Sequence, residues 1–195
     1  MRESAKTERR AEERIVRDAF AALTGRTGDA VRYTMMTDTP VGTIGLAEGS
    51  SGLMRISYSR DEDEFLRRVL RQFGDRPFLR DPLDNVRRAL DRYFSGKRLT
   101  FDLRFDLSSL PAFEQRVLEA TAKIPPGRVA AYAQVAAQAG NPRASRAAGN
   151  ALNHNPVAIV VPCHRVVRTD GSLGGYGGGL SRKEWLLQHE GATLA

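Results

Sequence analysis

The chain of 195 residues is long enough for one large domain or two small ones, and 41% of its residues are hydrophobic, as in ordinary globular proteins. No apolar run is long enough to cross a bilayer and the first residues are charged, so membrane insertion and secretion are not expected. The single cysteine excludes an internal disulfide and predicts a reducing, cytoplasmic location. The formal net charge of +7 fits nucleic acid as a partner, and it fits a solvated basic surface equally well.

The first 30 residues are predicted to form a charged extension with one amphipathic helix. Up to Ala22, apolar residues recur at helical spacing, so this helix would dock by an apolar stripe that consists of Ile15, Val16, Ala19, Phe20 and Leu23. Residues 24–29 are predicted to be a linker because they are rich in turn-forming residues.

Residues 31–107 are predicted to form an α/β domain. Short β-type runs separated by turns predict a small antiparallel sheet, with strands at residues 33–36, 43–46 and 53–56. Helical patterns follow at residues 62–73 and 82–94, and Ser95-Gly96 closes the second. Residues 101–107 alternate apolar and polar side chains, which predicts a further half-buried strand. The pattern becomes mainly helical between Phe105 and Pro111, so a second domain is placed at residues 108–195.

Two short helices joined by a glycine turn are predicted within this second domain. Residues 129–139 have helical apolar spacing, and Gly140 suits the left-handed position that ends a helix. Asn141 as N-cap and Pro142 as the first helical residue predict a second helix over residues 142–152. Together they form a helix-turn-helix pattern.

The second of these helices is unusually small in its side chains. It should stop before Asn155-Pro156, and its only charged side chains are Arg143 and Arg146. A helix with so few long polar side chains fits close, sequence-independent contact with DNA better than reading of base edges in the major groove. An ordinary helical hairpin packed through alanines explains the same pattern equally well.

Residues 158–161 form an apolar run, predicted as a buried strand or extended segment, that leads to Pro162 and Cys163. A thiol becomes a nucleophile as its thiolate, which needs a nearby base or positive charge, and His164 and Arg165 are adjacent. Neighbours in a regular strand point to opposite faces, so Cys163 and His164 could cooperate only through a bend at Pro162 or a bridging water. A lone cysteine is also commonly a small buried hydrophobic residue. One cysteine and three histidines without paired-ligand spacing predict no metal site.

Residues 171–179 contain six glycines. Such a loop either brings backbone groups close to a planar ligand or serves as a flexible connector. Ser181 to Glu184 form a capping-box pattern ahead of an apolar helix, so Glu184 is interpreted as structural. Glu190 follows that helix and is left free to orient a histidine.

The second domain resembles the O6-alkylguanine-DNA alkyltransferases, also called methylated-DNA–protein-cysteine methyltransferases. The similarity is dense from about Phe113 to Gly191 and centres on residues 159–166, Ile-Val-Val-Pro-Cys-His-Arg-Val. Further matching stretches, in the family's order and spacing, are residues 124–128, 139–142, 146–149, 155–156, 175–176 and 183–187. The resemblance implies an N-terminal ribonuclease-H-like α/β domain and a mainly-α, winged-helix-like C-terminal domain that carries the helix-turn-helix. It implies no cofactor.

The resemblance also implies a single-turnover reaction that moves the alkyl group of O6-alkylguanine in double-stranded DNA irreversibly to Cys163. O4-alkylthymine is a second candidate substrate. His164, through a water, would take the thiol proton, Glu190 would orient His164, and Tyr132 would donate a proton toward the departing base. Arg146 would enter the base stack from the minor groove to replace the flipped nucleotide. The other implied positions are DNA contacts (Asn141, Arg143, Thr169) and the base pocket with its supports (Asn155, Val166, Tyr176, Gly177, Lys183).

Two alternatives remain open for the sequence. A non-reacting protein that binds damaged bases and recruits other repair factors would leave Cys163, His164 and Glu190 unexplained. A cysteine hydrolase would need an oxyanion arrangement that the sequence does not display. The expected state is a monomer in solution, with cooperative binding on DNA left open.

Overall fold

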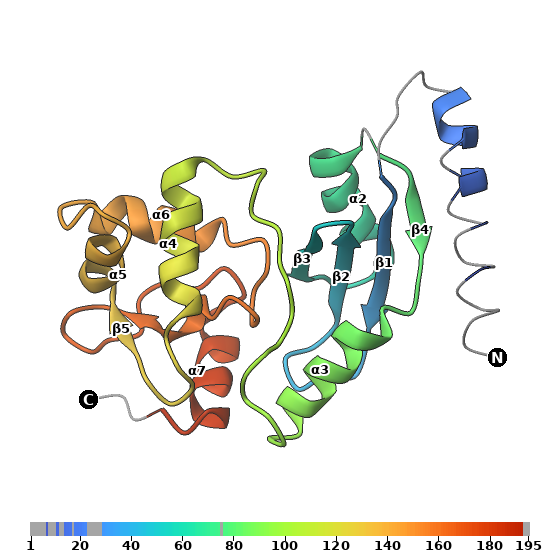
Figure 1. Cartoon of the computed structure of the whole chain (residues 1–195). Helices are drawn as coiled ribbons and strands as arrows, with labels where there is room; N and C mark the ends of the chain where they lie inside the picture. Colours follow the sequence, from blue (N-terminus) through green and yellow to red (C-terminus); the bar gives the residue numbers. More distant parts are fainter. Residues whose placement is uncertain are drawn as a thin grey trace.

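The computed structural model of the chain describes residues 7, 11, 14–16, 18–22, 29–74 and 76–192 (Figure 1). The described residues between 7 and 22 are helical, as predicted. Ile15 is 63% exposed, however, whereas Val16 and Phe20 are half-buried, so within the described residues the predicted apolar stripe is buried only in part. Leu23 and residues 24–28 of the predicted linker lie outside the described part.

A four-stranded sheet forms the centre of the N-terminal half. Its strands are β1 (Val31–Met36), β2 (Ile44–Gly49), β3 (Gly52–Tyr58) and β4 (Phe78–Arg80), in the order β3-β2-β1-β4. The pairs β1–β2 and β2–β3 are antiparallel, which confirms the predicted sheet. The prediction missed β4, which pairs parallel with β1, because three residues are too few to display an alternation. Strand β3 is the edge strand that lies nearest the C-terminal half (Figure 1).

Helices α2 (Glu62–Phe73) and α3 (Asp84–Phe94) pack on opposite faces of this sheet. Helix α2 has the predicted bounds, because Asp61 Oδ1 accepts a hydrogen bond from Glu64 N at 2.8 Å and caps its first turn. Helix α3 begins two residues later than predicted. Leu83, with φ of 47°, is in the left-handed region, so the helix cannot extend back to Pro82.

The predicted strand at residues 101–107 is wrong. This segment makes a single β-bridge, between Phe105 and Leu53, flanked by hydrogen bonds from Leu53 N to Arg104 O and from Asp106 N to Leu53 O, both 2.9 Å. Its apolar side chains alternate because Phe101, Leu103 and Phe105 pack on the core, and not because the segment belongs to the sheet.

The C-terminal half is mainly helical. It contains α4 (Ala112–Ala122), β5 (Ala130–Ala131), α5 (Tyr132–Gln138), α6 (Ser145–Asn153), a 3-10 helix η1 (Cys163–Arg165), β6 (Val166–Val167) and α7 (Leu180–His189). Helices α4, α5 and α6 pack against one another, and β5 pairs parallel with β6.

The helix-turn-helix is present, with corrected bounds. Helix α5 starts later than predicted because Ala130–Ala131 pairs with Val166–Val167 instead of joining the helix. Gly140 has a φ of 88° and ends this helix region as predicted. The predicted N-cap at Asn141 is wrong, because residues 141–144 form a turn closed by a bond from Ala144 N to Asn141 O at 3.0 Å.

Two other local predictions are corrected. Residues 158–161 are buried as predicted, but they turn: Ile159 has a φ of 74°, and Val161 N donates to Val157 O at 2.9 Å. The predicted capping box at Ser181 and Glu184 is wrong, because α7 already begins after Gly179 and has no side-chain cap.

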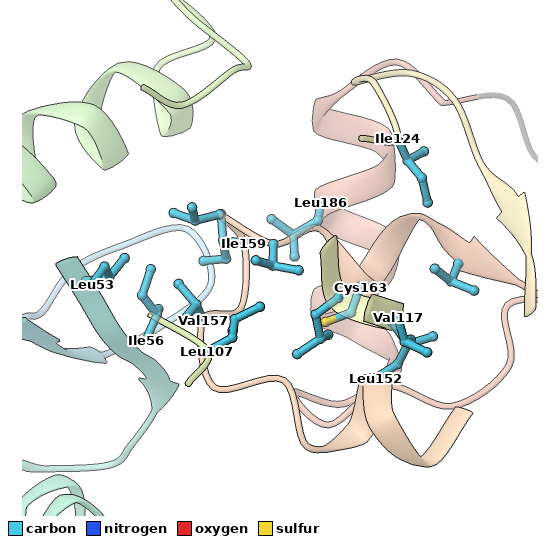
Figure 2. Packing of buried hydrophobic residues seen from close by; sticks show 14 of the residues in the cluster. Leu53, Ile56, Leu107, Val117, Ile124, Leu152, Val157, Ile159, Cys163 and Leu186 are labelled. Carbon is cyan, nitrogen blue, oxygen red and sulfur yellow. The ribbon is translucent and has the colours of Figure 1, made fainter. Parts of the chain in front are cut away.

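One hydrophobic core joins the two halves of the chain. Figure 2 shows Leu53 and Ile56 of β3 beside Val157, from which the core continues through Ile159 to Cys163. A β-bridge between Ile56 and Val157, and a hydrogen bond from Ile56 N to Pro156 O at 2.8 Å, fix this contact. The cysteine therefore lies in a segment that the edge strand of the N-terminal sheet helps to position.

Candidate active site

Cys163 is the first residue of the 3-10 helix η1, directly after Pro162. The chain bends here, as predicted, with Pro162 at φ −83° and ψ 64°. Bonds from Cys163 N to Val161 O and from Arg165 N to Pro162 O, both 2.9 Å, hold the bend. Cys163 is 8% exposed and belongs to the lining of a pocket.

His164 and Glu190 form a buried pair behind the cysteine. His164 Nε2 lies 3.0 Å from Glu190 Oε1, and neither side chain is exposed. Burial acts to raise the pKa of Glu190, but the hydrogen bonds from His164 and Arg165 outweigh it and hold this pKa at about 2. Because Glu190 is an anion, it accepts a hydrogen bond from the N–H at Nε2 of His164. A neutral His164 ring then has its lone pair on Nδ1.

His164 Nδ1 is buried and has no hydrogen-bond partner among the described residues. Burial lowers the pKa of His164, against the opposing influence of Glu190, so the ring is neutral near pH 7. Burial raises the pKa of Cys163, and the Asn155 amide and the charge of Lys183 counteract that rise. The site therefore combines a thiol that needs a base with an imidazole that has a free basic nitrogen.

Two further side chains bind Glu190: Arg165, which the sequence offered only as a positive charge beside the thiol, and Tyr93, which was missed as a site residue. Arg165 donates from Nε to Oε2 at 2.7 Å and from Nη2 to Oε1 at 2.8 Å. Tyr93 of α3 donates its hydroxyl proton to Oε1 at 2.6 Å. Tyr93 carries no local signal, because it lies 97 positions before Glu190.

Asn155 connects the end of α6 to the cysteine segment. Its Nδ2 donates to Cys163 Sγ at 3.0 Å and to Val161 O at 2.8 Å, while its Oδ1 accepts from Val157 N at 3.0 Å. A donor at the sulfur stabilises the thiolate more than the thiol. The structure thus brings Asn155 to the sulfur itself.

A pocket of about 130 Å³ opens beside Cys163. Its lining combines predicted residues with residues of the N-terminal half: Arg55, Ile56, Ser57, Tyr58, Arg68, Leu152, Asn153, Asn155, Ala158, Cys163, Tyr176, Gly177 and Gly178. Tyr176 is held in this wall by its hydroxyl, which lies 2.7 Å from that of Tyr58. Gly177 leaves space at the wall, since an added Cβ would meet only Asn153 O, at 3.8 Å.

Tyr132 and the glycine-rich loop lie next to each other. The Tyr132 hydroxyl donates to Gly175 O at 3.4 Å, and a Cβ on Gly174 would stand 2.8 Å from that hydroxyl. Burial raises the pKa of Tyr132, and a negative charge on Cys163 adds to the rise.

Lys183 binds backbone carbonyls of β6 and of the glycine-rich loop. Its Nζ donates to Val166 O at 2.6 Å, to Leu173 O, and to Gly175 O at 3.5 Å. Burial lowers the pKa of Lys183 to about 8, although the charge of Cys163 counteracts this. The lysine therefore joins β6 to the glycine-rich loop instead of serving as a surface charge.

The residues predicted to contact DNA are exposed. Arg146 lies on α6, Asn141 and Arg143 lie in the turn before that helix, and Thr169 follows β6. Ala148, Ala151 and Leu152 are the buried residues of α6, whereas Arg146 is on its exposed side.

Within the described residues, no group of three His, Cys, Asp or Glu side chains is placed to hold a metal ion. No helix in that part of the chain combines the length and apolar character needed to span a membrane.

Comparisons with known proteins match most of the chain to one family. Residues 31–107 match the family described as "6-O-methylguanine DNA methyltransferase, ribonuclease-like domain", and residues 112–192 match its "DNA binding domain". A methylated-DNA–protein-cysteine methyltransferase of Methanosarcina barkeri is 37% identical over 162 residues, which cover 83% of this chain and 99% of the relative. A protein of the same name from Salmonella typhimurium is 48% identical over 102 residues, covering 52% of this chain and 60% of the relative. The solved structure of Mycobacterium tuberculosis OGT in complex with DNA has a TM-score of 0.70 and 35% identity, covering 83% of this chain and 92% of that one.

Proposed function

Because the chain belongs to the 6-O-methylguanine-DNA methyltransferase family, we propose that Cys163 is the alkyl acceptor of a direct-reversal DNA repair reaction. The family reaction is alkyl transfer from DNA to a protein cysteine, and this chain has one cysteine. Its position carries the proposal: Cys163 lines a pocket, accepts a hydrogen bond from Asn155, and directly precedes the buried His164–Glu190 pair.

The substrate is O6-alkylguanine in double-stranded DNA, and the step is a displacement at the alkyl carbon. The Cys163 proton passes through a water to His164 Nδ1, and the imidazolium is stabilised by Glu190. Sγ then forms a bond to the alkyl carbon while the bond from that carbon to O6 breaks and its electron pair leaves with the base. Tyr132 supplies a proton to the base, which departs as neutral guanine, and the proton on His164 replaces the one that Tyr132 gave.

The product on the protein is a thioether. A carbon–sulfur bond of this kind is not hydrolysed by the groups in the site, so each molecule reacts once and needs no cofactor. A reactive thiol also requires reducing surroundings, which fits the cytoplasm.

DNA is the binding partner, and the helix-turn-helix is the surface that meets it. The target atom cannot be reached inside a duplex, and extrusion of the base costs a few kcal/mol. Arg146 is the exposed charge on α6, and its guanidinium is suited to fill the space that the base leaves on the minor-groove side. Asn141, Arg143 and Thr169 are exposed around it and would bind the DNA backbone. The protein would bind as a monomer.

Mass spectrometry of the protein after incubation with duplex O6-methylguanine DNA tests this function. One added methyl group is expected on the Cys163 peptide, with one lesion removed per protein molecule, and Cys163→Ala should remove none. Binding of damaged DNA with persisting lesions would instead indicate a recognition protein without chemistry. Several turnovers per molecule, or an unmodified Cys163 after complete repair, would overturn the proposal.

A further inference from the structure

A pair of tyrosines joins the two halves of the chain at the pocket beside Cys163. Tyr58 is the last residue of β3, Tyr176 belongs to the glycine-rich loop, and their hydroxyl oxygens are 2.7 Å apart. Both residues line the pocket together with Cys163. Tyr58 lies two positions after Ile56, so it is on the face of β3 that meets the cysteine segment. The N-terminal half therefore supplies an aromatic side chain to the pocket.

Each hydroxyl of this pair depends on the other. Within the described residues, neither hydroxyl oxygen has another hydrogen-bond partner. Burial raises the pKa of Tyr58 and of Tyr176, so both hydroxyls stay protonated at neutral pH and one donates to the other. A buried hydroxyl that loses its partner is costly, and its ring is driven to a position where water can bind it.

Arg182, in the first turn of α7, holds Tyr58 in place. Its guanidinium carbon stands 4.7 Å from the centre of the Tyr58 ring. The same side chain donates from Nε to Val41 O at 2.6 Å and from Nη1 to Gly178 O at 2.7 Å, so both halves of the chain bind it. The two tyrosine rings also pack on Gly178, where an added Cβ would overlap both of them. Tyr58 is therefore a fixed point against which Tyr176 rests.

Tyr176 in turn lies against the proposed base. Its ring meets that of His164 edge-on, with the ring centroids 6.5 Å apart and the planes at 89°. An alkyl chain attached to Sγ of Cys163 extends into the pocket that Tyr176 borders, and this pocket has a volume of about 130 Å³. A water takes up about 30 Å³ of liquid volume, so only a few heavy atoms fit beyond the reacting carbon. The position of the Tyr176 ring therefore limits the length of the alkyl group.

We propose that Tyr58 is a positioning residue for the alkyl transfer, because its hydroxyl holds the Tyr176 ring as the wall that restricts the pocket to short alkyl groups. The inference rests on the proposed transfer to Cys163 and deepens it by naming the substrate class, O6-alkylguanines with short chains. Sγ bonds to the first carbon of the chain, and the bond from that carbon to O6 breaks with its electron pair on the base. Tyr58 takes no part in these bond changes. Without its hydroxyl the Tyr176 ring turns toward water, so the pocket is wider and fits a methyl group less well.

The test measures single-turnover rates of transfer to Cys163 from two duplexes of one sequence, which carry O6-methylguanine or O6-butylguanine. The natural protein should prefer the methyl group. Tyr58→Phe keeps the ring and removes the hydroxyl. One neutral hydrogen bond corresponds to a roughly three- to tenfold change in rate, so the methyl rate should fall by about that factor. The butyl rate should not fall, so the butyl-to-methyl ratio should rise, and a mere loss of stability would not change this ratio.

Tyr33→Phe is the matched control, because it removes a hydroxyl of the same sheet that donates to Glu62 at 3.2 Å, and Tyr33 is not part of the pocket lining. It should leave the butyl-to-methyl ratio unchanged. Tyr176→Phe removes the same hydrogen bond from its other side, so the double variant with Tyr58→Phe should have the ratio of a single variant.

Three results would overturn the inference. These are an equal loss of rate on both substrates in Tyr58→Phe, effects of the two tyrosine substitutions that multiply, and a natural protein that transfers butyl as fast as methyl. Absence of transfer even from O6-methylguanine in the natural protein would overturn the proposed function instead.

Discussion

The hydroxyl of Tyr93, on helix α3, donates a hydrogen bond of 2.6 Å to Oε1 of Glu190 at the end of α7. The same oxygen faces His164 Nε2 at 3.0 Å, so a residue of the N-terminal half helps to hold the carboxylate that orients the proposed base. Tyr93 is fully buried, and solvent cannot replace its hydroxyl. The N-terminal half thereby contributes to the geometry of the site and does more than cover it.

Tyr93→Phe should lower both stability and the rate of alkyl transfer. A hydrogen bond to a charged group contributes about 1.5–3 kcal/mol, which corresponds to a fall of several degrees in Tm for a chain of this size. Thermal unfolding and the reaction with free O6-benzylguanine measure the two effects. Tyr33→Phe is the matched control, because it removes a hydroxyl that donates to Glu62 at 3.2 Å, away from the site. A Tyr93→Phe protein with natural rate and Tm would contradict this role.

The buried carboxylate of Glu190 makes stability depend on acid pH. Its pKa is about 2 in the folded chain against 4.5 as the ordinary value, so its contribution is complete above pH 4.5 and is lost as the pH falls toward 2. The shift corresponds to about 3 kcal/mol. Denaturant unfolding from pH 7 to pH 3 should therefore show a steeper loss for the natural protein than for Glu190→Gln.

Glu64→Gln is the control for that measurement. Glu64 also has a pKa of about 2, through its bonds to Arg60 and Arg68, but Arg60, just before α2, and Arg68, on α2, are both exposed enough for water to screen the interaction. Its replacement should leave most of the acid-dependent loss in place. A natural pH profile in Glu190→Gln would show that another group causes the acid sensitivity.

Arg146→Ala should impair repair in duplex DNA far more than the reaction with free O6-benzylguanine. The free base needs no extrusion from a duplex, whereas the lesion in DNA needs the space in the stack to be filled. Rates with both substrates, measured on the same protein preparation, check this expectation. Equal losses on the two substrates would rule out the intercalating role.

The glycine-rich loop offers a pair of adjacent substitutions with opposite expected results. Gly174→Ala would place a methyl group 2.8 Å from the Tyr132 hydroxyl, at a φ of 65° that side chains rarely adopt, so a loss of about 1–2 kcal/mol in stability is expected. Displacement of Tyr132 should slow alkyl transfer as well. Gly175→Ala meets no atom within 4 Å and should change little. Thermal unfolding and transfer rates of the two variants distinguish them, and similar behaviour would contradict a close contact between the loop and Tyr132.

Much of the local structure followed from patterns within a few residues. Helix α2 has its predicted bounds because Asp61 is a capping residue and the apolar side chains of the helix repeat every three or four positions. The first three strands were predicted from short β-type runs separated by turns. Gly140 was predicted to be left-handed because it follows the end of a helical pattern. Tertiary pairing overrode the local pattern elsewhere: α5 starts late because residues 130–131 form a strand with residues 166–167.

The candidate site also has a part that the sequence predicts and a part that only the tertiary structure shows. The sequence by itself determined the acceptor, because the chain has one cysteine and it stands in a recognisable stretch with His164. Only the tertiary structure decided what surrounds that cysteine, namely Tyr93 on Glu190 and Tyr58 in the wall of the pocket. Both come from the N-terminal half and meet the site through packing between residues about a hundred positions apart. Such contacts depend on how the two halves of the chain pack into one shared core, and a pattern of neighbouring residues has no information on that packing.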